Sequence, residues 1–498
     1  MTDAHPERPQ RPNLLFVITD QQRADTVAPG GPCRTPHLQA LAAAGTRFDR
    51  CYAPNPICSP TRASLFTGML PHAHGVTDVT HAVDATQADL APGMPFWPRR
   101  LRAAGYRTGY FGKWHVERSE RLEDFGFDTY ETELRLTGVQ GHAGQLSPRI
   151  AVQQEGYREF LLAGVHGGAA ADAPEARLVD LGIGFLEEAT RDPGRPWALV
   201  VATEAPHDPY LAPRELYERY DPDGIDLPAS FRDDLAGRPA VYRRIRGAWD
   251  GLTEREVREA IACYYATCTM LDDQVGRLLA ALDASGQADD TVVVFCSDHG
   301  DYLGAHGLFL KGVPAFEEAY RVPLILRGPG VPAGRTVAAP VGLIDLGPTL
   351  VRLLLGEDYP SHGRDLAPHL GDADPAATVG EAFAEFHGQR LRYTQRILWR
   401  DRWKYVFNGF AEDELYDVGT DPNELANLAA DPAHAATLRS MAARLWGIVR
   451  DTDDRTLGDA QYGMFRFAPV GPEAAERATS QVGAATGAAS ERDERGIP

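Results

Sequence analysis

The sequence predicts an α/β fold in which a large, mostly parallel β-sheet is flanked by helices and followed by a smaller C-terminal antiparallel α+β subdomain. Short apolar runs alternate with helical patterns from residue 13 to about 370, which is typical of a sheet covered on both faces. The runs are continuously apolar, as expected of strands buried on both sides. After residue 370 the pattern changes to short strands and one late helix.

Five apolar runs are the expected strands of the main sheet. They are LLFVI (14–18), YRTGYF (106–111), ALVVA (198–202), VVVFC (292–296) and PLIL (323–326). Each has the length of an ordinary strand, and helical patterns occupy much of the sequence between them. This alternation indicates crossover connections and therefore parallel neighbours.

Three helices are expected around the sheet. Residues 36–44 begin with a proline and stop before a glycine, as a capped helix does. Residues 264–284 place their leucines and valines on one helical face. Ser59 is a good N-cap and Pro60 suits a first helical position, so a third helix is expected over about 60–70.

The predicted organisation has four parts. Residues 1–12 form a flexible N-terminus, 13–370 the main domain, 371–466 a C-terminal subdomain and 467–498 a disordered tail rich in small and polar residues. In the subdomain, RILWRDRWKYVFNG and EDELYDV predict antiparallel strands, and a helix is expected near 434–450. Segments 131–180 and 210–260 show weak periodicity, and we interpret them as long insertions that carry specificity.

Composition excludes several classes of function. The chain has 498 residues, a hydrophobic content of 43% and a formal net charge of −20, which is unsuited to general nucleic-acid binding. Its six cysteines show neither disulfide nor zinc spacing. No apolar run approaches the roughly 18 residues of a membrane helix. We therefore expect a soluble, cytoplasmic protein without nucleic-acid or membrane partners, and nothing in the sequence specifies an oligomeric state.

Polar residues follow the apolar runs at the point where each expected strand ends. In chain order they are Asp20 and Gln21, then Lys113 and His115, then His207, then Asp298 and His299, with Lys311 further on. The carboxyl ends of parallel strands meet at one edge of a sheet. Any one of these residues alone could be an ordinary turn residue. Their coincidence at several strand ends favours a divalent-cation site surrounded by an anion site.

A further candidate lies in NPICSPTRASLFTG, residues 55–68. Cys58 would stand just ahead of a helix N-terminus, where free amides and the helix dipole favour an anion. Arg62 would lie in the first turn and could reach the same spot as a fork of donors. The segment matches C-x-P-x-R-x-x-L-x-T-G at every fixed position.

This motif resembles that of the sulfatase family, within the alkaline phosphatase superfamily. The segments NLLFVITDQQRAD, GKWH, APHDPY, SDHGDYLGAHG, RVPLILRGPG and ELYDVGTDPNELANLA are also similar to sulfatase segments, in the family's order, across residues 13–430. The resemblance implies an alkaline phosphatase-like fold. It also implies that a formylglycine-generating maturation enzyme oxidises Cys58 to formylglycine, an aldehyde that hydrates.

The resemblance further implies a role for each motif residue. Asp20, Gln21, Asp298 and His299 would hold one divalent cation, which the modified Cys58 would also touch. Arg62 would steady the hydrate, Lys113 and Lys311 would bind sulfate oxygens, His115 would deprotonate the hydrate and His207 would face the leaving oxygen. For His74 a site role and a structural role stay open. The implied reaction is hydrolysis of a small-molecule or carbohydrate sulfate ester through a sulfated enzyme intermediate.

Two motif positions differ from many sulfatases. The pairs Asp20-Gln21 and Asp298-His299 stand where many members have two acids and Asp-Asn, and the same combination occurs in the phosphonate monoester hydrolase branch and in some sulfatases. A phosphonate monoester or phosphodiester hydrolase is therefore the alternative, although GKWH favours sulfate. A non-catalytic binding protein is the third hypothesis, but such proteins usually lack the cysteine or the metal acids. We expect calcium, with manganese or magnesium as alternatives, because calcium prefers oxygen ligands and manganese accepts imidazole more readily.

Overall fold

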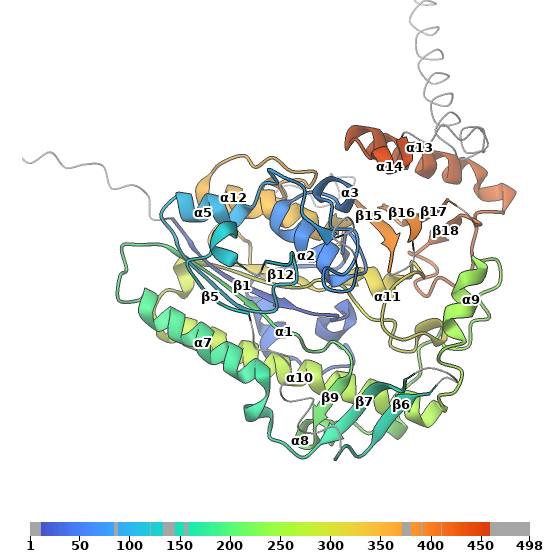
Figure 1. Ribbon diagram of the computed structural model, residues 1–498, viewed down its shortest axis with the longest axis horizontal. Helices are drawn as coiled ribbons and strands as arrows, with labels where there is room; N and C mark the ends of the chain where they lie inside the picture. Colours follow the sequence, from blue (N-terminus) through green and yellow to red (C-terminus); the bar gives the residue numbers. More distant parts are fainter. Residues whose placement is uncertain are drawn as a thin grey trace, which may run out of the picture.

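The main sheet has eight strands in the order β13-β2-β12-β10-β1-β8-β4-β5 (Figure 1). The structure is a computed structural model. It describes residues 11–83, 88–119, 121–132, 145–153, 158–370, 380–389, 392–409 and 411–458. The predicted flexible N-terminus falls almost entirely, and the predicted disordered tail entirely, outside these residues.

Parallel pairing dominates this sheet. Strands β10, β1, β8, β4 and β5 are parallel neighbours, whereas β12 is antiparallel to both β10 and β2. The bounds are β1 Asn13–Thr19, β2 Thr46–Phe48, β4 Arg107–Gly112, β5 Thr129–Glu131, β8 Trp197–Ala202, β10 Thr291–Ser297, β12 Leu324–Arg327 and β13 Arg335–Val337. The predicted mostly parallel sheet is confirmed, and all five predicted runs are strands in it.

Helices cover both faces of the sheet, which explains the continuous apolarity of its strands (Figure 1). In β1, Leu14, Phe16 and Ile18 pack with α2, α5 and α12, whereas Leu15 and Val17 pack with α1, α7 and α10. Burying each such side chain contributes about 1.5–3 kcal/mol. The helices are α1 Pro36–Ala43, α2 Cys58–Thr67, α5 Trp97–Ala103, α7 Pro174–Ala189, α10 Glu254–Ala284 and α12 Leu346–Leu355.

Helix α2 begins earlier than expected, and the prediction of Ser59 as its N-cap is wrong. The N-cap position belongs to Ile57, and Cys58 is already in the first turn. The Ser59 hydroxyl instead accepts a hydrogen bond from the backbone N–H of Thr80 at 3.2 Å. Pro60 is tolerated because the first four N–H groups of a helix lack intrahelical partners. Arg62 consequently lies in the second turn.

Both segments that we interpreted as insertions contain regular structure. Strands from them form a second sheet, β6-β7-β9, and β7 and β9 pack against α10. Helix α10 begins at Glu254, well before the predicted start at residue 264. The additional elements are β6 Arg149–Val152, β7 Phe160–His166, β9 Tyr210–Pro213, α8 Arg214–Tyr217 and α9 Ala240–Arg246.

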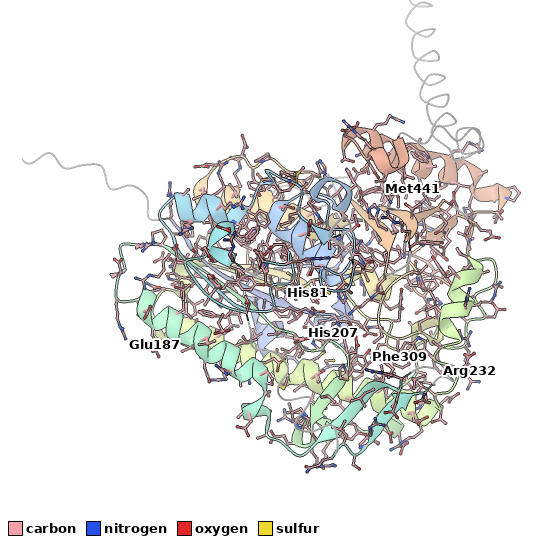
Figure 2. The ribbon with its side chains drawn as sticks, in the orientation of Figure 1. His81, Glu187, His207, Arg232, Phe309 and Met441 are labelled. Atoms are coloured by element: carbon pink, nitrogen blue, oxygen red, sulfur yellow. The ribbon has the colours of Figure 1, made fainter. Side chains whose placement is uncertain are left out.

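The C-terminal part forms a separate antiparallel sheet, β15-β16-β17-β18, as predicted. Helix α13 packs on one face of this sheet, where Met441 lies (Figure 2). The bounds are β15 Glu381–Gly388, β16 Arg392–Arg400, β17 Trp403–Asn408, β18 Glu414–Asp417, α13 Ala435–Asp451 and α14 Arg455–Gly458.

A short sheet, β11-β3-β14, and two one-turn helices complete the described structure. Their bounds are β3 Cys51–Tyr52, β11 Arg321–Val322, β14 Val341–Gly342, α3 Pro71–His74 and α11 Glu317–Tyr320. Among the described helices, none combines the length and the apolar character needed to cross a membrane. The six cysteines are buried and form no disulfide.

Candidate active site

The candidate site lies at the carboxyl ends of neighbouring strands of the main sheet. Thr19 at the end of β1 pairs with Ser297 at the end of β10, so Asp20 and Asp298 emerge side by side. Gly112 at the end of β4 pairs with Ala202 at the end of β8, which brings Lys113 to the same edge. The structure therefore brings together the charged side chains that follow these strands.

Arg62 ties the two aspartates together from helix α2. Its Nε lies 2.7 Å from Asp298 Oδ2, and its Nη2 lies 3.3 Å from Asp20 Oδ2. Its Nη1 donates to the backbone carbonyl of Lys113 at 2.6 Å. All three acidic and basic groups are fully buried. The guanidinium thus occupies the Oδ2 side of both carboxylates and leaves their Oδ1 atoms facing elsewhere.

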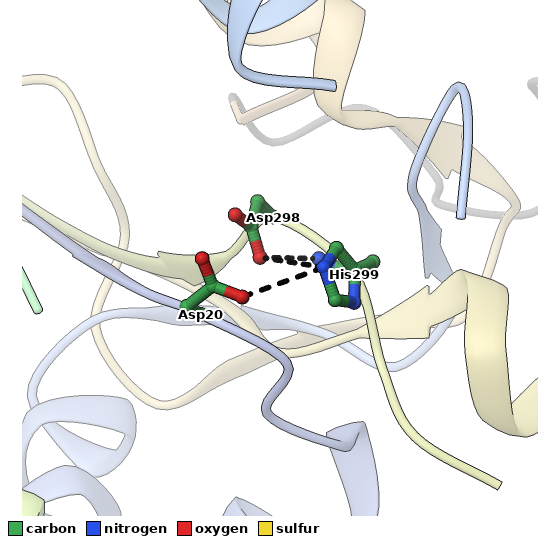
Figure 3. A group of neighbouring side chains, drawn as sticks. All are labelled: Asp20, Asp298 and His299. Atoms are coloured by element: carbon green, nitrogen blue, oxygen red, sulfur yellow. Dashed lines mark hydrogen bonds and ion pairs between the residues drawn. The ribbon is translucent and has the colours of Figure 1, made fainter. Parts of the chain in front are cut away.

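The Oδ1 atoms face His299, as Figure 3 shows. His299 Nε2 lies 3.4 Å from Asp20 Oδ1 and 3.7 Å from Asp298 Oδ1. The three residues each offer one ligand atom, and these atoms all lie within 4.8 Å of one another. Among the described residues, neither Asp20 Oδ1 nor His299 Nε2 has a hydrogen-bond partner, although both are buried.

This arrangement fits a cation. His299 Nδ1 lies 3.0 Å from the carbonyl of Gly300, so Nδ1 carries the proton and the lone pair of Nε2 points at the two carboxylates. Asp298 Oδ1 accepts backbone N–H groups of Gln21 and His299, but Asp20 Oδ1 and His299 Nε2 face each other without a donor, which is unfavourable unless positive charge lies between them. Two carboxylate oxygens and one imidazole nitrogen suit a divalent metal ion.

Cations surround the cluster on the side of Cys58. Lys113 Nζ lies 2.6 Å from Asp20 Oδ2. Burial opposes ionisation of Asp20, but Lys113 and the other nearby basic groups outweigh it and hold the pKa of this carboxyl well below its usual range. Cys58 is buried, lies outside the cluster of three, and is close enough to Arg62 and Lys113 to act on both electrostatically.

The side chain of Gln21 makes its contacts outside the cluster of Asp20, Asp298 and His299. Its side-chain oxygen accepts a short hydrogen bond from Lys311 Nζ, and its Nε2 donates to Asp301 Oδ2 at 2.5 Å and to Asp208 Oδ1 at 3.2 Å. Its backbone N–H donates to Asp298 Oδ1 at 3.2 Å. Gln21 therefore connects Asp298, through its backbone, to Lys311, through its side chain, and its role as a metal ligand stays a prediction.

Lys311 and His207 form a close pair on the other side of Gln21. The distance from Lys311 Nζ to His207 Nε2 is 2.6 Å, and His207 Nδ1 lies 2.7 Å from the carbonyl of Asp208. Nδ1 therefore carries the proton, and Nε2 accepts from the lysine. Burial lowers the pKa of His207 to about 4, since it outweighs the opposing effect of Asp208. His207 is therefore neutral near pH 7 and accepts a hydrogen bond from Lys311 Nζ.

His115 and His74 differ in their surroundings. His115 is held at a positive φ of 54°, and its Nδ1 is buried without a hydrogen-bond partner among the described residues. Burial and then Lys113 depress the pKa of His115 well below its usual value. His74 Nε2 lies 2.9 Å from Ser64 Oγ, and its Nδ1 accepts from the backbone of Val76. One nitrogen of His74 joins α3 to α2 and the other holds the turn after α3, which favours the structural role.

Sequence reasoning assigned no role to Asp208 and Asp301, which accept hydrogen bonds from Gln21, or to Tyr210. Asp208 follows His207 directly in APHDPY, and Tyr210 donates to Asp301 Oδ2 at 2.5 Å. Asp301 is fully buried, and burial raises its pKa to about 6. Their positions in APHDPY and SDHGDYLGAHG could have indicated that these residues lie near the site. Their contacts depend on how the loops that contain these two motifs pack together.

Comparison with known proteins identifies the family. A model of the sulfatase family matches residues 12–357, which is more than half of the chain. The chain belongs to the sulfatase family. It is therefore a sulfuric ester hydrolase of the alkaline phosphatase superfamily, as the motifs implied. A second model, of the N-sulphoglucosamine sulphohydrolase C-terminal region, matches residues 304–451.

Several relatives of this family member are informative. The chain is 31% identical to a choline-sulfatase of Rhizobium meliloti, over 88% of this chain and 87% of the relative. It is similar to the solved phosphonate monoester hydrolase of Silicibacter pomeroyi, with a TM-score of 0.73, 27% identity and coverage of 90% and 97% of the two chains. A protein solved with its substrate D-glucosamine-2-N,6-O-disulfate gives a TM-score of 0.69 at 23% identity over 89% and 98%, which shows the shared fold alone.

Proposed function

We propose that this chain hydrolyses sulfate esters at the carboxyl edge of its main sheet, with Cys58 in its formylglycine form and one divalent cation held by Asp20, Asp298 and His299. The observation that carries the proposal is the cluster of Asp20 Oδ1, Asp298 Oδ1 and His299 Nε2 beside the cations that face Cys58. The family in general uses a divalent metal ion and formylglycine, and this chain has residues suited to both.

The divalent cation and the formylglycine form of Cys58 would each supply a defined chemical property. A bound divalent cation would add positive charge where the reacting oxygens gather; the two carboxylates suit calcium, the expected ion, whereas the imidazole of His299 would suit manganese. The formylglycine form of Cys58 would supply a hydrated aldehyde in place of the thiol. Residue 58 is buried beside Arg62 and Lys113, and this position would shield the group from bulk water and restrict its motion.

The chain's own residues would bind the ester and move protons. Lys113 and Lys311 would neutralise the nonbridging sulfate oxygens, Gln21 would orient Lys311, and Arg62 would hold Asp20 and Asp298 in place. The Lys311–His207 pair would hold the proton for the leaving oxygen at its 2.6 Å contact. His115 Nδ1, buried without a partner among the described residues, would accept the proton whose removal releases sulfate.

Phosphonate monoester hydrolysis is the second candidate function. The similarity to the Silicibacter pomeroyi enzyme favours it, as do the Asp20-Gln21 and Asp298-His299 pairs. Sulfate monoesters and phosphonate monoesters both carry one negative charge, so charge alone does not separate them. The positions of Lys113 and His115 after β4 favour sulfate as the better substrate.

The test compares matched nitrophenyl sulfate and nitrophenyl phenylphosphonate esters on the enzyme produced with a maturation enzyme. We expect kcat/KM to be higher for the sulfate and to fall about 10²–10³-fold in Lys113→Ala, because an oxyanion contact is lost. Mass spectrometry of the same active preparation should show formylglycine at residue 58. A large preference for the phosphonate would reverse the ranking, and a thiol alone at residue 58 in active enzyme would contradict the formylglycine proposal.

A further inference from the structure

A cavity of about 190 Å³ lies beside His207. It is enclosed by the segment after β7, the N-terminal turn of α7, the segment 204–209 and two side chains of α10, Thr267 and Met270. Because the proposed function places His207 at the leaving oxygen, this space lies where the alcohol part of a substrate would extend. We name it the acidic cavity for the carboxylates described next.

Glu175 is the most buried carboxylate of the acidic cavity. Its side chain is in the first turn of α7, and the residue is 5% exposed. It accepts backbone hydrogen bonds, one of them from Ala205 N at 3.2 Å. Among the described residues, no lysine, arginine or histidine forms an ion pair with it. A carboxylate this buried is normally paired with a cation or protonated.

Glu204 is a second carboxylate that lines the same cavity. It is only partly exposed, and it lies close enough to Lys113 for the two charges to interact. No side-chain hydrogen bond or ion pair joins it to another described residue. Burial raises the pKa of both Glu175 and Glu204. A cation bound between them would stabilise the charged forms that burial disfavours.

The rest of the lining indicates what kind of cation fits. No lysine or arginine lines the cavity within the described structure, and no phenylalanine, tyrosine or tryptophan does so. Quaternary ammonium groups are usually recognised by aromatic faces, whereas an ammonium with N–H donors pairs with carboxylates. Pro174, Pro206 and Leu211 offer apolar walls for a short carbon chain.

We propose that the acidic cavity binds the alcohol part of the substrate and selects sulfate esters whose alcohol carries a primary or secondary ammonium group. Such an ester has opposite charges at its two ends. The sulfate would meet Lys113 and Lys311, and the ammonium would meet Glu175 and Glu204. The inference rests on the proposed function above, which it extends from the reaction to the substrate class.

The test measures sulfate release from 2-aminoethyl sulfate and from propyl sulfate, its neutral isostere. The ammonium group also makes the alcohol a better leaving group, so the decisive quantity is the change in the ratio of the two kcat/KM values between wild type and variant. We expect Glu175→Gln and Glu204→Gln each to lower this ratio about tenfold or more, as loss of a charged hydrogen bond does. Partial misfolding would scale both substrates equally and leave the ratio unchanged.

Glu187→Gln is the matched control, because Glu187 is exposed on the same helix and lies far from His207 (Figure 2). It should keep the wild-type ratio. A ratio that stays constant in both cavity variants, while nitrophenyl sulfate is hydrolysed, would overturn the cavity proposal alone. A better rate for the trimethylammonium ester than for 2-aminoethyl sulfate would also overturn it. Failure of the wild type to release sulfate from any ester would instead overturn the proposed function, and the cavity proposal with it.

Discussion

At the scale of single residues, Arg62 determines which atoms of the site remain available. It takes one oxygen from each aspartate, so the opposite oxygens of Asp20 and Asp298 point together at His299. A lysine could not do this, because only a guanidinium presents several donors in a fixed plane. The motif arginine therefore shapes the proposed metal site as well as balancing its charge.

Asp298→Asn tests the metal cluster with little change of shape. The amide keeps the volume of the carboxylate but loses its charge, so both metal content and kcat should fall, the latter by about 10²-fold or more. Elemental analysis and an aryl sulfate assay measure the two effects. Asp290→Asn, at the exposed opposite end of β10, is the control and should retain both. Full metal occupancy in Asp298→Asn would exclude this residue from the ligand set.

The sequence predicted the charged strand ends but not the contacts around Gln21. Asp20, Lys113 and Asp298 could be placed because parallel strands end at one edge and each residue directly follows a strand. The side-chain amide of Gln21 contacts Lys311 and Asp301 because the loop 301–311 comes back to the segment after β1, and a single sequence contains no signal for that path. Side-chain orientation in a loop-built network depends on packing that only the fold supplies.

At the scale of elements, the end of β4 depends on a glycine. Gly112 has a φ of 108°, and a Cβ atom there would lie 1.9 Å from the carbonyl oxygen of Ala202 on β8. The absent side chain lets β4 stay paired with β8 while the next residue, Lys113, turns toward Asp20. Both the pairing of β4 with β8 and the placement of Lys113 therefore depend on a glycine at residue 112.

Gly112→Ala should destabilise the fold by about 3 kcal/mol, because a backbone clash adds to the strain of a positive φ. Thermal unfolding of both proteins under identical conditions measures the loss. Gly194→Ala is the control, since its new Cβ would meet nothing within 4 Å, and it should change stability by less than about 0.5 kcal/mol. Equal melting temperatures for Gly112→Ala and wild type would show that the strand end can shift.

The two misplaced helix starts have different causes. The sequence contains a signal for the early start of α10, because Thr253 and Glu256 form a capping box. The first turns are rich in charged residues, so the apolar periodicity that indicates a helix is weak there. The start of α2 was not visible, because isoleucine is no capping residue. There the side chain of Asn55 accepts a hydrogen bond from the backbone N–H of Ile57 at 2.9 Å. A residue that precedes the helix therefore provides the hydrogen-bond acceptor for the N-cap residue.

At the scale of the whole molecule, β15 joins the C-terminal sheet to α3 and to residues 55–57 just before Cys58, which we call the cysteine loop. Asn55 Nδ2 donates to the backbone carbonyl of Glu385 at 2.7 Å. The carboxylate of Glu385 lies 2.5 Å from His72 Nδ1, and His72 Nε2 lies 2.9 Å from the carbonyl of Thr452. The composition change after residue 370 predicted this sheet, but not its docking, because the contacts join polar residues hundreds of positions apart.

This junction predicts how the stability of the molecule depends on pH. Burial opposes protonation of His72, but Glu385 outweighs it and raises the pKa of His72 to about 9 from an ordinary 6.5. A raised histidine pKa stabilises the fold fully below the unfolded value and loses that effect as pH rises through the folded value. The contribution should therefore be largest below pH 6.5 and decline by about 3 kcal/mol as the pH passes through 9.

His72→Gln removes the titrating charge and keeps a polar side chain at the junction. The difference in unfolding free energy between wild type and His72→Gln, measured by denaturant titration at several pH values, should shrink as the pH rises toward and beyond 9. His434→Gln, a partly exposed histidine just before α13, should give a difference that is small at every pH. A wild-type advantage over His72→Gln that is constant from acid to alkaline pH would mean that the His72–Glu385 contact is an ordinary hydrogen bond. The C-terminal sheet would then be held against the cysteine loop without this charge.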